Sequence, residues 1–251
     1  MPYGLYLSAE GANAQAKRLE ILANNMANVD TVGFKRQLAL VQARYAEAIE
    51  QGLLEPGTGA IEDQGGGVYV RQTQTDYSPG PLKHTQGRTD LAVEGDGFFV
   101  VAKGDESFLT RAGNFRFDAD GRLVTQQGHA VLSDSGSPVA INPADPSWQW
   151  TTEGAIRQAG AVQNLAMVAP GSLGDLVPVG ENLFRPLAEP EPLATDQRRV
   201  AVGYLEGSGV QPTVEMTQLI EASRAFEANV NMLKTQDEML GGLVNRVLRP
   251  A

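Results

Sequence analysis

Apolar residues recur at a seven-residue spacing near both ends of the chain, a pattern that predicts long helices with a narrow apolar face. Near the N-terminus, one line consists of Leu5, Ala12, Leu19 and Met26. Alanines stand four positions after the first three of these residues, at Ala9, Ala16 and Ala23. Because alanine side chains are small, this face would let a partner helix approach closely.

The C-terminal end repeats the spacing with larger side chains. Its main line consists of Leu219, Phe226, Leu233, Leu240 and Val247. A second line contains Met216, Val230 and Val244 and is interrupted by Ser223 and Asp237. Such a repeat indicates left-handed supercoiling against another helix. A helix over residues 210–248 would be roughly 58 Å long, whereas a compact middle domain would be roughly 37 Å across. The apolar face would therefore need another long helix, from the same chain or from a neighbour.

Between these ends, short runs of alternating polar and apolar residues predict an all-β domain, either a sandwich or an irregular barrel. Strands are expected at residues 97–101, 114–117, 122–125 and 163–169. The middle two flank the turn Asp118–Gly121, whose glycine suits a positive φ, and so predict a hairpin. The mixed stretch before this domain favours a helix over residues 38–51, followed by the glycine-rich loops at 57–59 and 65–67.

The chain is therefore predicted to be an α+β protein. A discontinuous helical domain of the coiled-coil type, formed by both termini, accompanies a central all-β domain. The expected segments are an N-terminal helix over residues 1–36, a connecting segment over 37–65, the β domain over 66–206 and a C-terminal helix over 207–251.

Composition excludes several kinds of site and partner. The 251 residues include 20 basic and 30 acidic ones, a formal net charge of -10, so binding to nucleic acid or anionic membranes is not expected. The chain has no cysteine, which excludes disulfides, thiolate zinc sites and cysteine nucleophiles. No apolar run approaches the roughly 18 residues of a membrane span, so direct membrane insertion is not expected. Residues 1–5 lack the pattern of a cleavable signal peptide, and none is expected.

Candidate chemical motifs are better explained by turns and surface residues. Asp118–Gly121 resembles the start of a calcium loop, but His129 stands where that loop needs its bidentate glutamate. The glycines of Gly95–Gly97 precede a strand instead of opening a helix. His84 and His129 lack a third ligand at helical spacing, and Ser208 lacks the flanking pattern of a nucleophile elbow. We therefore predict no enzymatic activity, no catalytic or metal site and no cofactor.

The chain resembles the flagellar rod and hook proteins in a series of motifs that covers nearly its whole length. Residues 23–36 (ANNMANVDTVGFKR) resemble the family's N-terminal signature, an asparagine-rich helix end followed by a Thr-x-Gly-Phe-Lys turn. Residues 90–99 (DLAVEGDGFF) resemble its central motif, and residues 216–240 its C-terminal helix. Further matches lie at residues 110–115, 123–125, 180–184 and 203–208. The motif residues singled out are Asn24, Asn25, Asn28, Gly33, Phe34, Lys35, Gly95, Gly97, Phe98 and Phe99.

This resemblance implies a structural subunit of the bacterial flagellar basal-body rod, the axial drive shaft that transmits torque, with the heptad lines of both helices as its assembly interface. The expected partners are copies of itself, other rod and hook axial proteins and the flagellum's own export apparatus. The expected location is the rod that spans the periplasm. One β domain of about 140 residues favours a rod subunit over a hook subunit, and we favour the proximal over the distal rod type. The alternatives are a hook-type subunit and a non-flagellar β-domain binding module that oligomerises through a coiled coil.

Overall fold

The computed structural model describes residues 3–45, 49, 52, 55, 65–145 and 147–247, which belong to two compact units. The helical unit contains Met1–Ala27, Gln37–Asp76 and Gln211–Ala251. The β unit contains Asn28–Arg36 and Tyr77–Val210. Each unit is therefore built from segments that are far apart in the sequence.

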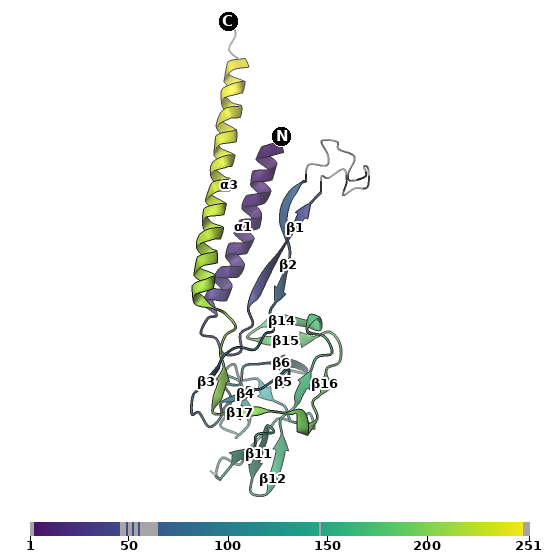
Figure 1. Cartoon of the computed structure of the whole chain (residues 1–251). Helices are drawn as coiled ribbons and strands as arrows, with labels where there is room; N and C mark the ends of the chain where they lie inside the picture. The colour runs from purple at the N-terminus through teal and green to yellow at the C-terminus, as the bar shows by residue number, and fades with distance from the viewer. Residues whose placement is uncertain are drawn as a thin grey trace. The chain divides into compact units, whose positions relative to one another are not determined.

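Two helices and a hairpin form the helical unit. Helices α1 (Tyr3–Ala27) and α3 (Pro212–Val247) lie side by side (Figure 1). The antiparallel hairpin of β1 (Gln37–Arg44) and β2 (Gly67–Thr75) packs against α1. Both terminal helices are as expected, although α1 ends well before residue 36. Helix α3 begins at its proline, whose fixed φ and missing N–H suit the first helical position.

The expected helix over residues 38–51 is wrong over residues 38–44, because residues 37–44 form β1. Farther along the expected range, Ile49 is helical. Strand β1 pairs with β2 from Gln37 opposite Thr75 to Arg44 opposite Gly67. Its backbone hydrogen bonds to a distant strand outweigh a local helical preference. The loop glycines expected at 57–59 lie outside the described residues.

The strands of the β unit that pair with one another are all antiparallel. Its largest sheet has the strand order β14-β15-β6-β5-β9-β8-β7, with β13 paired to β5 and to β16. The remaining strands form a three-stranded sheet, β10-β11-β12, and the pairs β17-β4 and β18-β3. The strands are β3 (Leu82–His84), β4 (Leu91–Val93), β5 (Phe98–Lys103), β6 (Glu106–Thr110), β7 (Arg116–Phe117), β8 (Leu123–Val124), β9 (Ala130–Val131), β10 (Gln149–Trp150), β11 (Ala155–Gln158), β12 (Ala161–Asn164), β13 (Met167–Ala169), β14 (Leu176–Gly180), β15 (Leu183–Pro186), β16 (Glu191–Pro192), β17 (Val200–Val202) and β18 (Tyr204–Glu206). Two short 3₁₀ helices, Leu173–Asp175 and Thr195–Gln197, complete the unit.

Strand β5 is buried on both of its faces. Because side chains alternate along a strand, the adjacent Phe98 and Phe99 point to opposite sides. Phe99 belongs to the larger core cluster and packs edge-on against Phe115, with a centroid distance of 5.1 Å. Phe98 belongs to a second cluster with Phe184, where the ring centroids are 6.0 Å apart. These two motif residues therefore pack in the hydrophobic core of the β unit, one in each cluster.

The expected hairpin is confirmed, since β7 pairs with β8 around Gly121 at φ +80°. The single strand expected at 163–169 is instead two strands, β12 and β13. Between them, the Leu165 and Ala166 N–H groups donate to other segments of the β unit. The observed division also differs from the expected boundaries. Residues 28–36 belong to the β unit, and β2 belongs to the helical unit. The sandwich or barrel geometry stays a prediction.

Candidate functional site

The N-terminal motif turn, residues 28–36, is held against the β unit by backbone hydrogen bonds. The Gly33 N–H donates to the Glu206 carbonyl (2.8 Å), and the Gly209 N–H donates to the Phe34 carbonyl (2.9 Å). The Asn182 side chain also donates to the Val32 carbonyl (2.8 Å). Motifs separated by well over a hundred residues in the sequence therefore meet at this turn.

A buried cluster of Lys35, Glu206 and Arg111 lies beside this turn, and we call it the ionic cluster. The Lys35 Nζ atom lies 2.6 Å from Glu206 Oε1, and Arg111 Nη1 lies 3.4 Å from Glu206 Oε2. All three side chains are at most 3% exposed. Lys35 also donates to the Ser78 carbonyl (2.9 Å), and the Gly80 N–H donates to Glu206 Oε1 (2.9 Å).

The ionic cluster contains two cations and a single carboxylate. Arg111 gains further support from the Gly95 carbonyl, which accepts from Nη2 at 2.6 Å, and from the Phe98 ring, whose centroid is 4.7 Å away. Its Nε atom is buried and has no hydrogen-bond partner among the described residues. Burial lowers the pKa of the Arg111 guanidinium, an effect that Glu206 and Asp96 oppose. The guanidinium still remains charged at neutral pH. The carboxylate of Glu206, with a smaller contribution from Asp96, stabilises this charge in the buried site.

Gly33 is the position in the motif turn at which only glycine fits. Its φ is +68°, and a Cβ atom there would lie 2.6 Å from the Ala112 nitrogen, which is fixed backbone. We expect Gly33→Ala to lower the free energy of unfolding of the β unit by about 2–4 kcal/mol, from backbone strain and the steric overlap together. The matched control is Gly136, which has φ +78° and open space around it. Gly136→Ala should cost only about 1 kcal/mol from strain. Equal losses in chemical denaturation would show that the turn is not closely packed.

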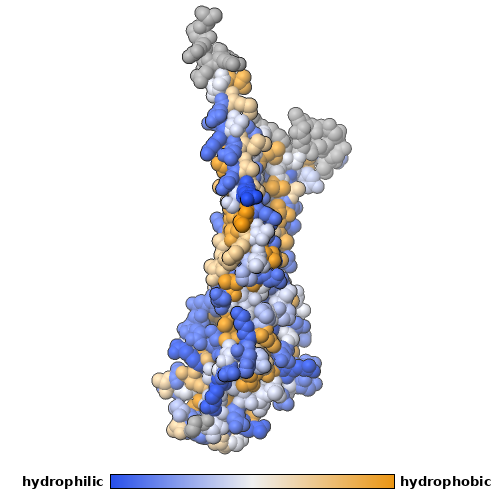
Figure 2. Space-filling model, turned by 60° about the vertical axis from the view of Figure 1, so that its left-hand side comes forward, coloured by the Kyte–Doolittle hydropathy of each residue, from blue (hydrophilic) through white to orange (hydrophobic). Residues whose placement is uncertain are grey.

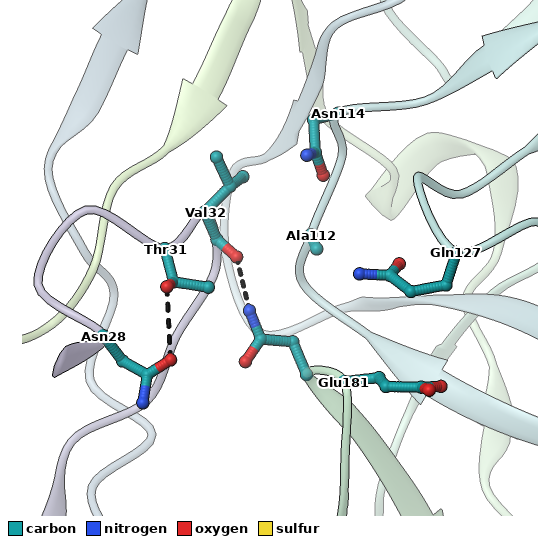
Figure 3. Close-up of a pocket in the computed structure, with 8 residues that line it drawn as sticks. Asn28, Thr31, Val32, Ala112, Asn114, Gln127 and Glu181 are labelled. Carbon is teal, nitrogen blue, oxygen red and sulfur yellow. Dashed lines mark hydrogen bonds between the residues drawn. The ribbon is translucent and has the colours of Figure 1, made fainter. Parts of the chain in front are cut away.

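A cavity of about 150 Å³ adjoins the motif turn within the β unit (Figure 3). Its lining residues are Asn28, Thr31, Val32, Ala112, Asn114, Gln127, Glu181 and Asn182. In Figure 3 the side chains of Asn114 and Gln127 extend into the space beside Ala112. Glu181 is the one lining residue with a titratable side chain, and hydrogen bonds from Lys103 and His129 lower the pKa of its carboxyl group. The cavity thus offers mainly amide and hydroxyl groups for hydrogen bonding.

The other candidate chemical residues have structural partners. Asp118 Oδ1 accepts from the Asp120 and Arg122 N–H groups, as expected for a turn. Ser208 is buried, and its hydroxyl accepts from the Val210 N–H. His129 pairs with Glu181 at 2.8 Å, and the His84 ring contacts the Tyr204 ring. Among the described residues, no group of three or more His, Cys, Asp or Glu side chains is placed to hold a metal ion.

In the helical unit, Asn25 joins three elements. It is completely buried, and its amide exchanges hydrogen bonds with the backbone of Gln37 at 2.8 and 2.9 Å. Its Nδ2 atom also donates to Glu215 Oε2 on α3 (3.3 Å), and Glu215 is itself completely buried. The neighbouring Asn24 donates to the Gln37 side chain (3.2 Å). The asparagine-rich motif therefore fixes the end of α1 to the start of β1 and to α3.

Helices α1 and α3 meet in an antiparallel register along small and polar residues. A Cβ atom at Gly4 would lie 2.9 Å from Gln236, and one at Gly11 would lie 3.0 Å from Asn229. Moving seven residues forward in α1 thus moves the contact seven residues back in α3. The residues of α1 that contact α3, Gly4 and Gly11, form the contact line. Each stands one position before a residue of the apolar line Leu5–Met26 expected from the sequence. Glycine brings the helix axes close, and the long amides of α3 fill the space above it.

The structure places the expected interface residues beside this contact line. On α1, Leu5, Leu19 and Met26 are half-buried and Ala12 is buried. On α3, Leu219, Phe226, Val230, Leu233 and Leu240 are half-buried, whereas Met216 is 54% exposed. The side chain of Val247 lies outside the described ones. Their role in assembly stays a prediction.

Helix α3 is longer than its partner, with 36 residues against 25. By the observed register, residues after Asp237 have no described α1 residue opposite them, and we call 238–247 the α3 extension. Its exposed apolar side chains are Met239 (59%), Leu243 (60%) and Val244 (54%). Figure 2 shows hydrophobic residues between hydrophilic ones along α3. No helix among the described residues has the length and apolar character needed to cross a membrane.

Exposed apolar side chains along the paired helices are typical of a surface that binds another protein. Three family models match the chain. One described as "Flagella basal body rod protein" matches residues 5–35. One described as "Flagellar hook protein FlgE/F/G D1 domain" matches residues 92–164. One described as "Flagellar basal body rod FlgEFG protein C-terminal" matches residues 201–246.

Similarity to relatives extends over almost the whole chain. The "Flagellar basal-body rod protein FlgF" of Caulobacter vibrioides is 32% identical over 98% of this chain and 98% of its own. The "Flagellar basal-body rod protein FlgG" of Bacillus subtilis is 32% identical over 96% of this chain and 97% of its own. The FlgF protein of Mesorhizobium japonicum is 30% identical over 93% of both chains. The chain belongs to the family of flagellar basal-body rod proteins.

Proposed function

We propose that the protein is a structural subunit of the bacterial flagellar basal-body rod and assembles with copies of itself and with other axial proteins. Membership in the family supports a place in the rod, because the relatives are named flagellar basal-body rod proteins. The observation that carries the mode of assembly is the α3 extension, whose side chains Met239, Leu243 and Val244 are each more than half exposed. Another axial helix, packed as in a coiled coil, would cover them.

Assembly through one repeated contact gives this protein its mechanical role. When a surface on one copy binds a different surface on the next, the contact repeats without closing and generates a tube. The helical unit supplies the apolar contact, and the β unit supplies a second, mostly polar surface. The work is the transmission of torque, without catalysis. Subunits reach the rod through the flagellum's own export apparatus, and the proximal rod is the favoured position.

The two alternatives receive less support. A hook-type subunit would be expected to carry additional β domains, whereas this chain aligns with rod proteins over 97–98% of their lengths. A binding module that only dimerises would need one partner helix per chain. The exposed apolar side chains of α3 fall on more than one side of the helix, since Met216 and Met232 are both more than half exposed and lie about 160° apart around its axis. This arrangement favours contacts with more than one neighbour.

We expect the α3 extension to become ordered only on assembly. In a monomer its apolar side chains Met239, Leu243 and Val244 face water. Packing, not intrinsic propensity, stabilises most helices. Hydrogen exchange should therefore show amides after Asp237 gaining about 100-fold protection between dilute monomer and assembled rod. Full protection already in a verified monomer would mean that the helix is preformed.

Deletion tests the proposed function directly. Cells without this protein should be non-motile and should yield basal bodies that lack a complete rod in electron micrographs. Re-expression of the chain should restore both the rod and swimming. Normal basal bodies in the deletion strain would overturn the proposal.

A further inference from the structure

The chain passes between the two units four times. Each of these passages lies near the ionic cluster, either in the sequence or through a hydrogen bond. The passages fall after residues 27, 36, 76 and 210. The first leads into the motif turn, which is bonded at Gly33 to Glu206. The second follows directly after Lys35. A force carried by the polypeptide from one unit to the other must therefore enter the β unit beside these residues.

The third passage is bonded to the residues of the ionic cluster, and the fourth is bonded to Phe34, the residue before Lys35. Just after residue 76, the Ser78 carbonyl accepts from Lys35 and the Gly80 N–H donates to Glu206. Just before residue 211, the Gly209 N–H donates to the Phe34 carbonyl. One ammonium group and one carboxylate thus tie three chain segments together.

We infer that the ionic cluster is the mechanical anchor at which torque carried along the chain enters the β unit. The bonds to the different segments act in parallel, so a pull on any one segment is shared by the others. Arg111 extends the connection further, because it joins Glu206 to the Gly95 carbonyl just before β5. Charged hydrogen bonds that are shielded from water are stronger than neutral ones and resist sudden rupture. The inference rests on the proposed function only for the origin of the load.

Single-molecule pulling on the full chain tests the anchor. Because the protein has no cysteine, handles can be attached specifically through Gln37→Cys and Gln211→Cys, which flank the second and fourth passages. We expect Lys35→Met to lower the force that detaches these segments from the β unit by about twofold, since it removes one of the buried charged partners. Lys35→Arg keeps the cation and should retain more than half of that force.

The matched control is Arg198→Met, which breaks a different ion pair of the β unit, one whose arginine is buried and whose aspartate is exposed. Arg198 is 5% exposed at its side chain, lies 2.9 Å from Asp134 and bonds otherwise to the Leu193 and Leu165 carbonyls, none of which belongs to a passage. It should lower the melting temperature while leaving the detachment force unchanged. If Arg198→Met lowers the force as much as Lys35→Met, or if Lys35→Met leaves it unchanged, the cluster is not an anchor. Should Lys35→Met fail to fold, Arg111→Lys gives the same comparison in a milder form.

A cell assay separates this inference from the proposed function. Cells with Lys35→Met should contain basal bodies in normal number but lose swimming speed disproportionately as the viscosity of the medium rises. If the swimming speed of these cells falls with viscosity only as much as that of cells with Arg198→Met, the anchor is contradicted but the proposed function is not. Absence of the wild-type protein from basal bodies would contradict the proposed function, whatever the pulling experiment shows.

Discussion

Replacement of Leu243 by aspartate is expected to abolish rod assembly while leaving the monomer folded. Leu243 is 60% exposed in the chain, so a charge there costs little in the monomer. It stands seven residues after Gln236, on the line that faces α1 farther down the helix. In an assembled rod the carboxylate would be buried among apolar side chains, which costs about 3 kcal/mol or more at each contact, roughly a 100-fold loss of affinity. Cells should become non-motile, with the variant present but absent from basal bodies.

The control for this variant is Asn231→Asp, which adds the same charge to the same helix. Asn231 is exposed and lies two positions from both Asn229 and Leu233, about 200° around the helix from the contact lines. It should assemble normally, as should the conservative Leu243→Met. Swimming by cells that carry only Leu243→Asp would show that the α3 extension has no part in assembly.

Glu206→Gln is expected to be the most damaging single change within the ionic cluster. It removes the carboxylate that bonds to both the ammonium of Lys35 and the guanidinium of Arg111, two buried cations, which should cost about 3–5 kcal/mol. Lys35→Met leaves Glu206 paired with Arg111 and should cost about 1–3 kcal/mol. Thermal unfolding of the β unit should therefore show the larger fall for Glu206→Gln, about 10 °C or more.

The ratio of the two losses is the informative quantity. If the cluster were an ordinary one-to-one ion pair, the two substitutions would be equally harmful. A greater loss for Lys35→Met than for Glu206→Gln would mean that Arg111 does not share the carboxylate. Isothermal denaturation of both variants at neutral pH decides between these outcomes.

Hydrophobic periodicity predicted the terminal helices but placed their contact line one residue away from the observed one. The seven-residue spacing is the same for Leu5 and Ala12 as for Gly4 and Gly11. A count of apolar residues favours the first pair, whereas close packing of two helices favours the glycines. The partners of these glycines, Gln236 and Asn229, are polar and carry no hydrophobic signal. The sequence thus predicts the spacing of such an interface better than its composition.

The residues of the ionic cluster could be found as motif members, but their partners could not. Lys35 and Glu206 are 171 positions apart, and no local pattern indicates that they meet. Arg111 lies within the matched segment 110–115, and that match indicates no role for its side chain. The sequence does not indicate strand β1 either, because its pairing with β2 is a long-range contact. Short hairpins such as β7–β8 were predictable because their turn chemistry is local.

Chemical labelling of purified basal bodies tests the central claim, assembly through the terminal helices, most directly. Leu243→Cys and Asn231→Cys would each introduce the only cysteine of the chain. In monomers both should react rapidly with a maleimide, because both positions are exposed. In basal bodies the account predicts that Leu243→Cys is protected while Asn231→Cys still reacts. Equal labelling of Leu243→Cys in monomers and in basal bodies would contradict it.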